Sequence, residues 1–196
     1  MAPSTAKILV GAPDRVTGAV MAAPLGTALP TTPIIAPNVA FVDLGYISED
    51  GISFSEALEW QKIYDWGGDQ VRTFLSKATF TLKWSFLETN DDALKASYDT
   101  SNVTITAATV STGKYTALKY NTVEPTPKAW LIHMADSQLV DAPRKSRLVI
   151  PNGQITERGD KSYTRNGGIM WPVTLECYPD SSGNSAYQYF TDGDYS

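Results

Sequence analysis

A strict alternation of apolar and polar side chains in the segment ATFTLKWSF is the strongest constraint on how this chain folds. The apolar positions are Ala78, Phe80, Leu82, Trp84 and Phe86. The polar positions between them are Thr79, Thr81, Lys83 and Ser85. Successive side chains of a β-strand point to opposite faces of a sheet, so this period of two predicts a strand with one buried face and one polar face. The fold must bury one row and leave the other against water or a polar neighbour.

A short helix is predicted directly after this strand, without a linker. The segment TNDDALKAS begins with two capping candidates, Thr89 and Asn90, and Thr89 has Asp92 three residues later, which is the spacing of a capping box. Leu94 and Tyr98 share one face of such a helix. Because a helix of about ten residues is marginal alone, we expect that face to rest on the sheet. The acidic residues at its start are interpreted as caps and not as a metal or catalytic cluster.

From Phe41 onward the chain reads as a series of β-strands. Segments rich in Val, Ile, Thr and aromatic residues are separated by turn signals such as DWGGD and STGK. The motifs PNG at 151–153 and NGG at 166–168 predict two hairpin turns, because Asn and Gly tolerate the positive φ that such turns require. Residues 129–135 are apolar on both faces, which predicts a central strand. A second alternation covers residues 169–177, so a mainly β fold is expected.

Residues 1–40 differ in composition from the rest of the chain. They hold six of the twelve prolines, together with many Ala and Thr. Proline cannot continue a helix or donate to a central strand, so we expect a Pro/Ala/Thr-rich arm that docks on the surface or on a partner. A β-rich domain with a short C-terminal tail then covers residues 41–196. On this interpretation, removing residues 1–37 leaves the fold intact.

The charge of the chain argues against a protein that grips nucleic acid. Charged residues make up 19% of the sequence and the formal net charge is -5, whereas DNA-binding proteins neutralise phosphates with clustered Lys and Arg. The sequence has no uninterrupted apolar run of roughly 18 residues, so neither a membrane anchor nor a secretory signal is expected.

The sequence offers no convincing set of catalytic residues, metal ligands or cofactor-binding motifs. Its single cysteine, Cys177, excludes an intramolecular disulfide and is interpreted as a buried strand residue. Its single histidine, His133, lies in an apolar strand with no nucleophile or carboxylate assigned to it by a motif, which favours a structural role. STGK lacks the earlier glycine and the following Ser or Thr of a phosphate-binding loop. We therefore predict a protein that is not an enzyme, with five Trp serving packing or interfaces.

Taken in order, the segments from about residue 39 to residue 189 resemble the major tail tube protein of long-tailed, non-contractile bacteriophages. The most specific parts are the passage from strand to helix with ETN at its junction and the strand end TLECYPD with the following SGN turn. The matching segments are FVDLGYISEDGISFS, EWQKIYDWGGDQVRTF, ATFTLKWSFLETNDDALKASY, RKSRLVIPNGQITERGDKSYT and MWPVTLECYPDSSGNSAYQYF.

The resemblance implies a β-sandwich or half-barrel with one short flanking α-helix. In that family six subunits form a ring whose strands join into one β-barrel, and the rings stack into a tube in the virion tail. The tube surrounds the tape measure protein during assembly in the host cytoplasm and later conducts the viral DNA into the host. The expected partners are further copies of this chain, the tape measure protein, the tail terminator and the distal tail protein. DNA is expected to pass without specific binding.

Two candidate sites follow for such a tube. The polar row Thr79, Thr81, Lys83 and Ser85 is predicted to face either the channel or a neighbouring subunit. The loop predicted to contact the next ring consists of Tyr64, Asp65, Trp66, Gly67, Gly68, Asp69 and Gln70.

Two alternative functions remain open at this stage. Another ring-forming tail component, such as a terminator or distal tail protein, would form rings that do not polymerise alone. A phage-borne carbohydrate-binding module would use exposed Trp and Tyr side chains and would bind sugar saturably.

Overall fold

The computed structural model of this chain describes residues 9–14, 19–136, 144–165 and 167–191. Those residues form mainly β structure with a single α-helix, as expected from the sequence. The elements are β1 Ala12–Pro13, β2 Val20–Pro24, β3 Val42–Asp43, β4 Ser53–Tyr64, β5 Gln70–Phe86, α1 Asp91–Tyr98, a 3-10 turn at Thr100–Asn102, β6 Val103–Thr106, β7 Tyr115–Leu118, β8 Lys128–Asp136, β9 Arg144–Arg158, β10 Trp171–Tyr178 and β11 Tyr187–Phe190.

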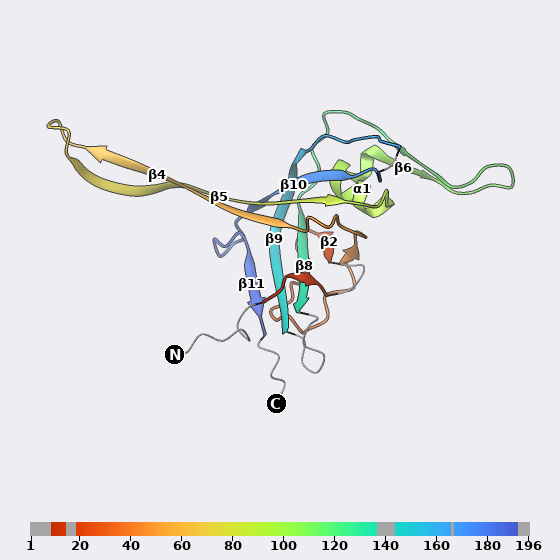
Figure 1. Cartoon of the computed structure of the whole chain (residues 1–196), viewed down its shortest axis with the longest axis horizontal. Helices are drawn as coiled ribbons and strands as arrows, with labels where there is room; N and C mark the ends of the chain where they lie inside the picture. The colour runs from red at the N-terminus through yellow and green to blue at the C-terminus, as the bar shows by residue number, and fades with distance from the viewer. Residues whose placement is uncertain (1–8, 15–18, 137–143, 166, 192–196) are drawn as a thin grey trace.

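Nine of the described strands form one large antiparallel sheet (Figure 1). The strand order is β3-β2-β8-β9-β10-β5-β4, with β1 added to β8 and β11 added to β9. Strand β9 changes partner along its length, since residues 146–149 pair with β11 and residues 152–158 pair with β10. The sheet is open and not closed into a barrel. The predicted central strand at 129–135 is confirmed as β8, between β2 and β9.

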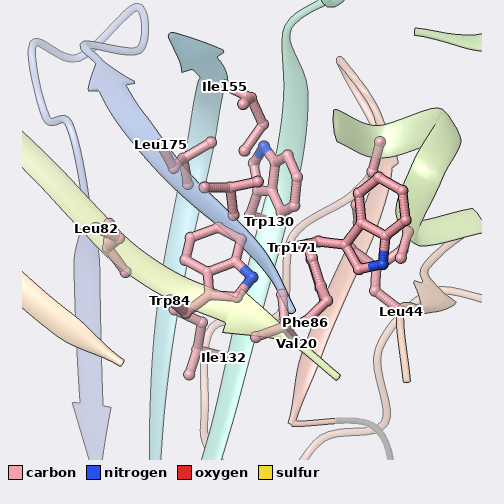
Figure 2. Close-up of a cluster of buried hydrophobic side chains, with 14 of the residues drawn as sticks. Val20, Leu44, Leu82, Trp84, Phe86, Trp130, Ile132, Ile155, Trp171 and Leu175 are labelled. Carbon is pink, nitrogen blue, oxygen red and sulfur yellow. The ribbon is translucent and has the colours of Figure 1, made fainter. Parts of the chain in front are cut away.

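The sheet curls around its main core. In Figure 1, β5 runs across the view whereas β8 and β9 of the same sheet run down it. Trp84 on β5 and Trp130 on β8 meet in the core although β9 and β10 lie between their strands. Their ring centroids are 5.7 Å apart and their planes are inclined by 65°, which is an edge-to-face contact. Figure 2 shows the two indoles as close neighbours within the core. Leu82 and Phe86 fill the same core and are both fully buried. The apolar row predicted for residues 80–86 therefore supplies the core.

A second, smaller cluster covers the opposite face of the same sheet. It consists of Ala23, Phe41, Ala129, Leu131 and Val149.

Buried Arg147 holds the segment 32–35 in place. Its Nη1 donates to the carbonyl oxygens of Thr32 and Ile35, each at 2.7 Å. Its Nε donates to Nδ1 of His133 at 3.1 Å. Burial lowers the pKa of Arg147, and the charge of nearby Asp14 opposes that shift. His133, 9% exposed, thus belongs to a structural hydrogen-bond network.

Part of the predicted N-terminal arm belongs to the sheet. Strand β2 pairs with β8 from Val20↔Ile132 to Pro24↔Lys128, and Val20 is fully buried. The prolines do not prevent this pairing because Pro24 closes the strand. The division between residues 1–40 and 41–196 stays a prediction, but the expectation that the fold survives without residues 1–37 does not fit this pairing.

Helix α1 begins at the second of the two capping candidates. The Asn90 side chain accepts a hydrogen bond from the backbone N–H of Asp92 at 2.8 Å. The capping box predicted from Thr89 is wrong, because the Thr89 hydroxyl instead accepts from Nε1 of Trp171 at 3.3 Å. Leu94 and Tyr98 are both buried, as predicted for the face that packs on the core.

Acidic Asp91 in the first turn ties the helix to β7. Its carboxylate accepts from Nζ of Lys114 and from the hydroxyl of Thr116, each at 2.5 Å. These two hydrogen bonds lower the pKa of Asp91. The acidic start of α1 thus has a structural role.

The hairpin turn predicted at PNG is wrong. Residues 151–153 lie inside the continuous strand β9. Glycine is required at position 153 for packing, because a Cβ there would lie 3.0 Å from Cδ1 of Trp130 and 3.1 Å from a methyl carbon of Leu175. Strands β9 and β10 are antiparallel neighbours. The predicted NGG turn at 166–168 falls on their long connection, where residue 166 lies outside the described residues.

Replacing Gly153 by alanine is expected to lower the free energy of unfolding by roughly 1–3 kcal/mol, because the added methyl overpacks the core against Trp130 and Leu175. Urea denaturation measures this change. Gly113→Ala is the matched control, since nothing lies within 4 Å of a Cβ there, and its effect should stay within about 0.5 kcal/mol. Equal stabilities of the two variants would contradict the packing argument.

Removing residues 1–37 is expected to destabilise the fold, because it uncovers the edge of β8 and takes away buried Val20. Loss of that one side chain from the core costs about 2 kcal/mol. The melting temperature of the truncated chain measures the effect, and removal of residues 1–8 alone is the control. A truncated chain that melts with the full-length protein would restore the interpretation of residues 1–37 as a dispensable arm.

Candidate assembly surface

A long β-hairpin made of β4 and β5 projects from the body of the molecule (Figure 1). Every residue of β4 is exposed, and β5 is exposed from Gln70 to Ala78. In the described part of the chain, no third strand pairs with β4. Because a ribbon of two strands is marginally stable in water, this hairpin is a candidate for contact with another molecule.

The predicted ring-contact loop is the tip of this hairpin. Asp65 organises the turn, since its Oδ1 accepts from the backbone N–H of Asp69 at 2.7 Å and its carbonyl oxygen accepts from Gly68 N–H at 3.2 Å. Gly68 has a φ of 92°, which favours glycine. Trp66 is fully exposed and Tyr64 is 56% exposed. All seven residues from Tyr64 to Gln70 thus lie together at the far end of the projection.

The predicted polar row lies on one face of β5, at the base of the hairpin. Thr79, Thr81 and Ser85 are half-buried and Lys83 is exposed. Strand β4 places Ser55 opposite Thr81 and Ser53 opposite Lys83.

Neighbouring strands extend this row into a wider polar surface. Strand β10 places Glu176 opposite Thr81 and Thr174 opposite Lys83. Strand β9 then places Gln154 opposite Glu176 and Glu157 opposite Thr174, and the Thr174 hydroxyl donates to Glu157 Oε2 at 3.1 Å. We call this surface the polar sheet face; it consists of Ser53, Ser55, Thr81, Lys83, Thr174, Glu176, Gln154 and Glu157.

Sequence reasoning missed the contributions of β9 and β10 to this face. The alternation over residues 169–177 did place Thr174 and Glu176 in one row. Nothing local in the sequence indicates that β10 lies beside β5, so the sequence alone does not join the two rows into one surface.

A groove of about 360 Å³ runs along this face, lined in part by Lys83, Glu157 and Pro172.

Three features of the described residues bear on other kinds of function: metal ligands, reactive thiols and membrane-spanning helices. No group of three or more His, Cys, Asp or Glu side chains in the described ranges could hold a metal ion. Burial raises the pKa of the Cys177 thiol to about 12, which disfavours the reactive thiolate at neutral pH. Among the residues that the structure covers, no helix is long and apolar enough to cross a membrane.

The five tryptophans divide into two groups. Trp84, Trp130 and Trp171 are buried in the main core. Trp60 and Trp66 are exposed on the hairpin, at 57% and 105%. The sequence predicts that the tryptophans pack in the core or at interfaces. Three of them do lie in the core, and the two exposed ones are available for an interface.

Trp66→Ala is expected to leave the free energy of unfolding within about 0.5 kcal/mol of the parent, because the side chain is fully exposed. Trp130→Ala, at 1% exposure, should instead cost about 3–5 kcal/mol. Urea denaturation followed by circular dichroism compares the two variants. A large loss of stability in Trp66→Ala would mean that the tip packs on its own subunit.

Comparison with known proteins identifies the family. A family model described as phage tail tube protein matches residues 1–194. No curated protein matches the sequence.

Two solved structures are similar in outline, each 12% identical and each covering 97% of this chain and 100% of its own. They are the anti-feeding prophage cap, described as a tube terminating cap, at a TM-score of 0.45, and the PVC sheath-tube complex of an extracellular contractile injection system in the extended state, at 0.37. Both scores are too low to carry an argument about this chain. The family match alone covers nearly the whole sequence, and on that ground this protein belongs to the phage tail tube protein family and is a structural component of a phage tail.

Proposed function

We propose that this chain is the major tail tube subunit of a long-tailed, non-contractile phage, with six copies in each ring and rings stacked into a conduit for viral DNA. The observation that carries the proposal is the β4–β5 hairpin. Strand β4 is exposed on both faces, and among the residues that the structure describes no further strand pairs with its outer edge. An exposed strand of twelve residues invites pairing with another chain. A ring of subunits satisfies such edges without leaving a free end.

The polar sheet face is the proposed lining of the channel. Its charged members are Lys83, Glu157 and Glu176, so two carboxylates accompany one ammonium group. A surface with this balance, on a chain of net charge -5, does not hold a polyanion through phosphate contacts. DNA passes such a wall without specific binding, as a conduit requires. Thr79 and Ser85 continue the same row on β5.

The tip of the hairpin is the proposed contact between stacked rings. Residues 64–70 lie farthest from the body along the projection (Figure 1), so they reach another subunit without disturbing the sheet. Residues 1–40 are a second proposed source of contacts between copies. The tape measure protein inside the tube, together with the terminator and the distal tail protein at its ends, completes the proposed set of partners. Assembly takes place in the host cytoplasm.

Negative-stain electron microscopy of the purified protein at increasing concentration tests this function. Hollow tubes with a regular axial repeat are expected, because each copy carries the same unsatisfied hairpin. Single rings that never stack would favour the terminator or distal tail alternative. A monodisperse monomer up to high concentration, even after mixing with virion parts, would rule out the proposed function.

A variant with a shortened hairpin tests whether the projection itself is needed for assembly. Leu58 and Ala78 are opposite each other in the ladder, so joining them through a two-residue Asn-Gly turn keeps the base of the hairpin paired. This variant should fold as a monomer and form no tubes. Tubes of normal appearance from the shortened chain would show that the projection does not carry assembly.

A further inference from the structure

The core-side face of the sheet continues outward along the hairpin. Phe54 is opposite Leu82, and Leu82 is fully buried in the main core. Side chains two residues apart on a strand share a face, so Leu58 and its partner Ala78 follow on the same side as Phe54. Phe80 lies between them, stacked on Phe54 with ring centroids 6.4 Å apart. The row that fills the core thus continues outside the body as a largely apolar row, which Glu56, opposite Phe80, interrupts with one charge.

A β-bulge keeps this row apolar farther out. The ladder shifts between Glu59 and Trp60, where β5 has one extra residue, Ser76, whose hydroxyl donates to the Glu59 carbonyl oxygen at 3.0 Å. After the shift, Leu75 is opposite Trp60 and joins the core-side face. We call the resulting surface the apolar hairpin face; it consists of Phe54, Leu58, Trp60, Leu75, Ala78 and Phe80.

This face is open to solvent in the single chain. Leu58, Trp60 and Leu75 are 49%, 57% and 45% exposed. At the base of the hairpin the face leads into a groove of about 260 Å³. The groove is lined by Phe54, Glu56 and Phe80 and, from the body, by Leu148, residues 183–186 and Gln188. An exposed, largely apolar surface that ends in a groove is the kind of feature that marks a protein interface.

Resting on the proposed tube function, we propose that a second copy of this chain covers the apolar hairpin face in the assembled tube, while the polar sheet face stays wet. The free edge of β4 and this face belong to the same hairpin, so a copy that pairs with the edge also reaches across the face. Every copy of the chain carries both this face and the free edge of β4, so each copy can bind the next in the same way. The chain supplies apolar side chains elsewhere for the contact, since Leu25, Ile34 and Ile35 are each 54% exposed.

A contact between two different surfaces of identical subunits is heterologous. Such a contact repeats from copy to copy, so it builds rings or helical assemblies and not closed pairs. The apolar hairpin face and residues 25–35 are different regions of the chain, which suits this geometry.

Thiol labelling of two adjacent positions tests the proposal. Leu58→Cys lies on the apolar hairpin face, and Ala57→Cys lies on the opposite side, where Ala57 pairs with Thr79. A small fraction of each variant is mixed with wild-type protein and labelled with N-ethylmaleimide before and after tube formation. Assembly should slow the labelling of Leu58→Cys by roughly tenfold or more, because thiol reactivity follows exposure, and should leave Ala57→Cys nearly unchanged. Wild-type protein is the blank, since Cys177 is buried.

The outcomes separate this proposal from the proposed function. Tubes in which Leu58→Cys reacts as fast as in the monomer, or in which only Ala57→Cys is protected, overturn the proposal and leave the tube function intact. Absence of tubes overturns both. A pair of charge variants gives a second readout: Leu58→Glu should prevent tube formation while the monomer keeps its melting temperature, and Ala57→Glu should still assemble. Normal tubes from Leu58→Glu would also overturn the proposal.

Discussion

Strand β5 sets the constraint on which the rest of the structure depends. Its seventeen residues, Gln70 to Phe86, run from the exposed tip of the hairpin into the centre of the core. Side chains along a strand alternate between the two faces of the sheet, and only a bulge interrupts this alternation. The row of β5 that contains buried Trp84 therefore determines which side of the hairpin is apolar where it leaves the body. Other side chains of the body bury the inner half of this row. The outer half stays exposed in the single chain, and under the proposed function a second copy covers it. The alternation that makes the core would then also direct assembly.

The two sides of the hairpin therefore serve different requirements. Core-side residues such as Leu58 and Trp60 gain stability when water is removed from them. On the opposite side, Lys83 of β5 and Glu176 of the neighbouring strand β10 need only solvent, because charged groups lose hydration when they are buried. A channel wall and a subunit contact can thus share one pair of strands without conflict, provided that the wall is the polar side.

Local patterns allowed part of this structure to be predicted from the sequence. The alternation over residues 78–86, helix α1 and strand β8 are encoded within short windows, so they were read correctly. The PNG turn failed because Gly153 is set by its contact with Trp130, twenty-three residues away in sequence. Strand β2 and the β9 and β10 parts of the polar sheet face were missed for the same reason. Each depends on which strands become neighbours, and periodicity does not encode that choice.

Charged side chains on β4 add specificity to a surface that would otherwise pair without discrimination. An exposed edge strand favours uncontrolled association unless charges limit the partners that fit. Glu59 lies opposite Lys77 within the hairpin, so its charge has a counterpart in the same subunit. Glu56 instead lies opposite Phe80, on the apolar side. A partner that covers this face must either match Glu56 with a cation or leave it at a wet rim, since a buried unpaired carboxylate is strongly unfavourable. In the proposed tube, this requirement would restrict the register of the contact and favour one ordered arrangement over non-specific aggregation.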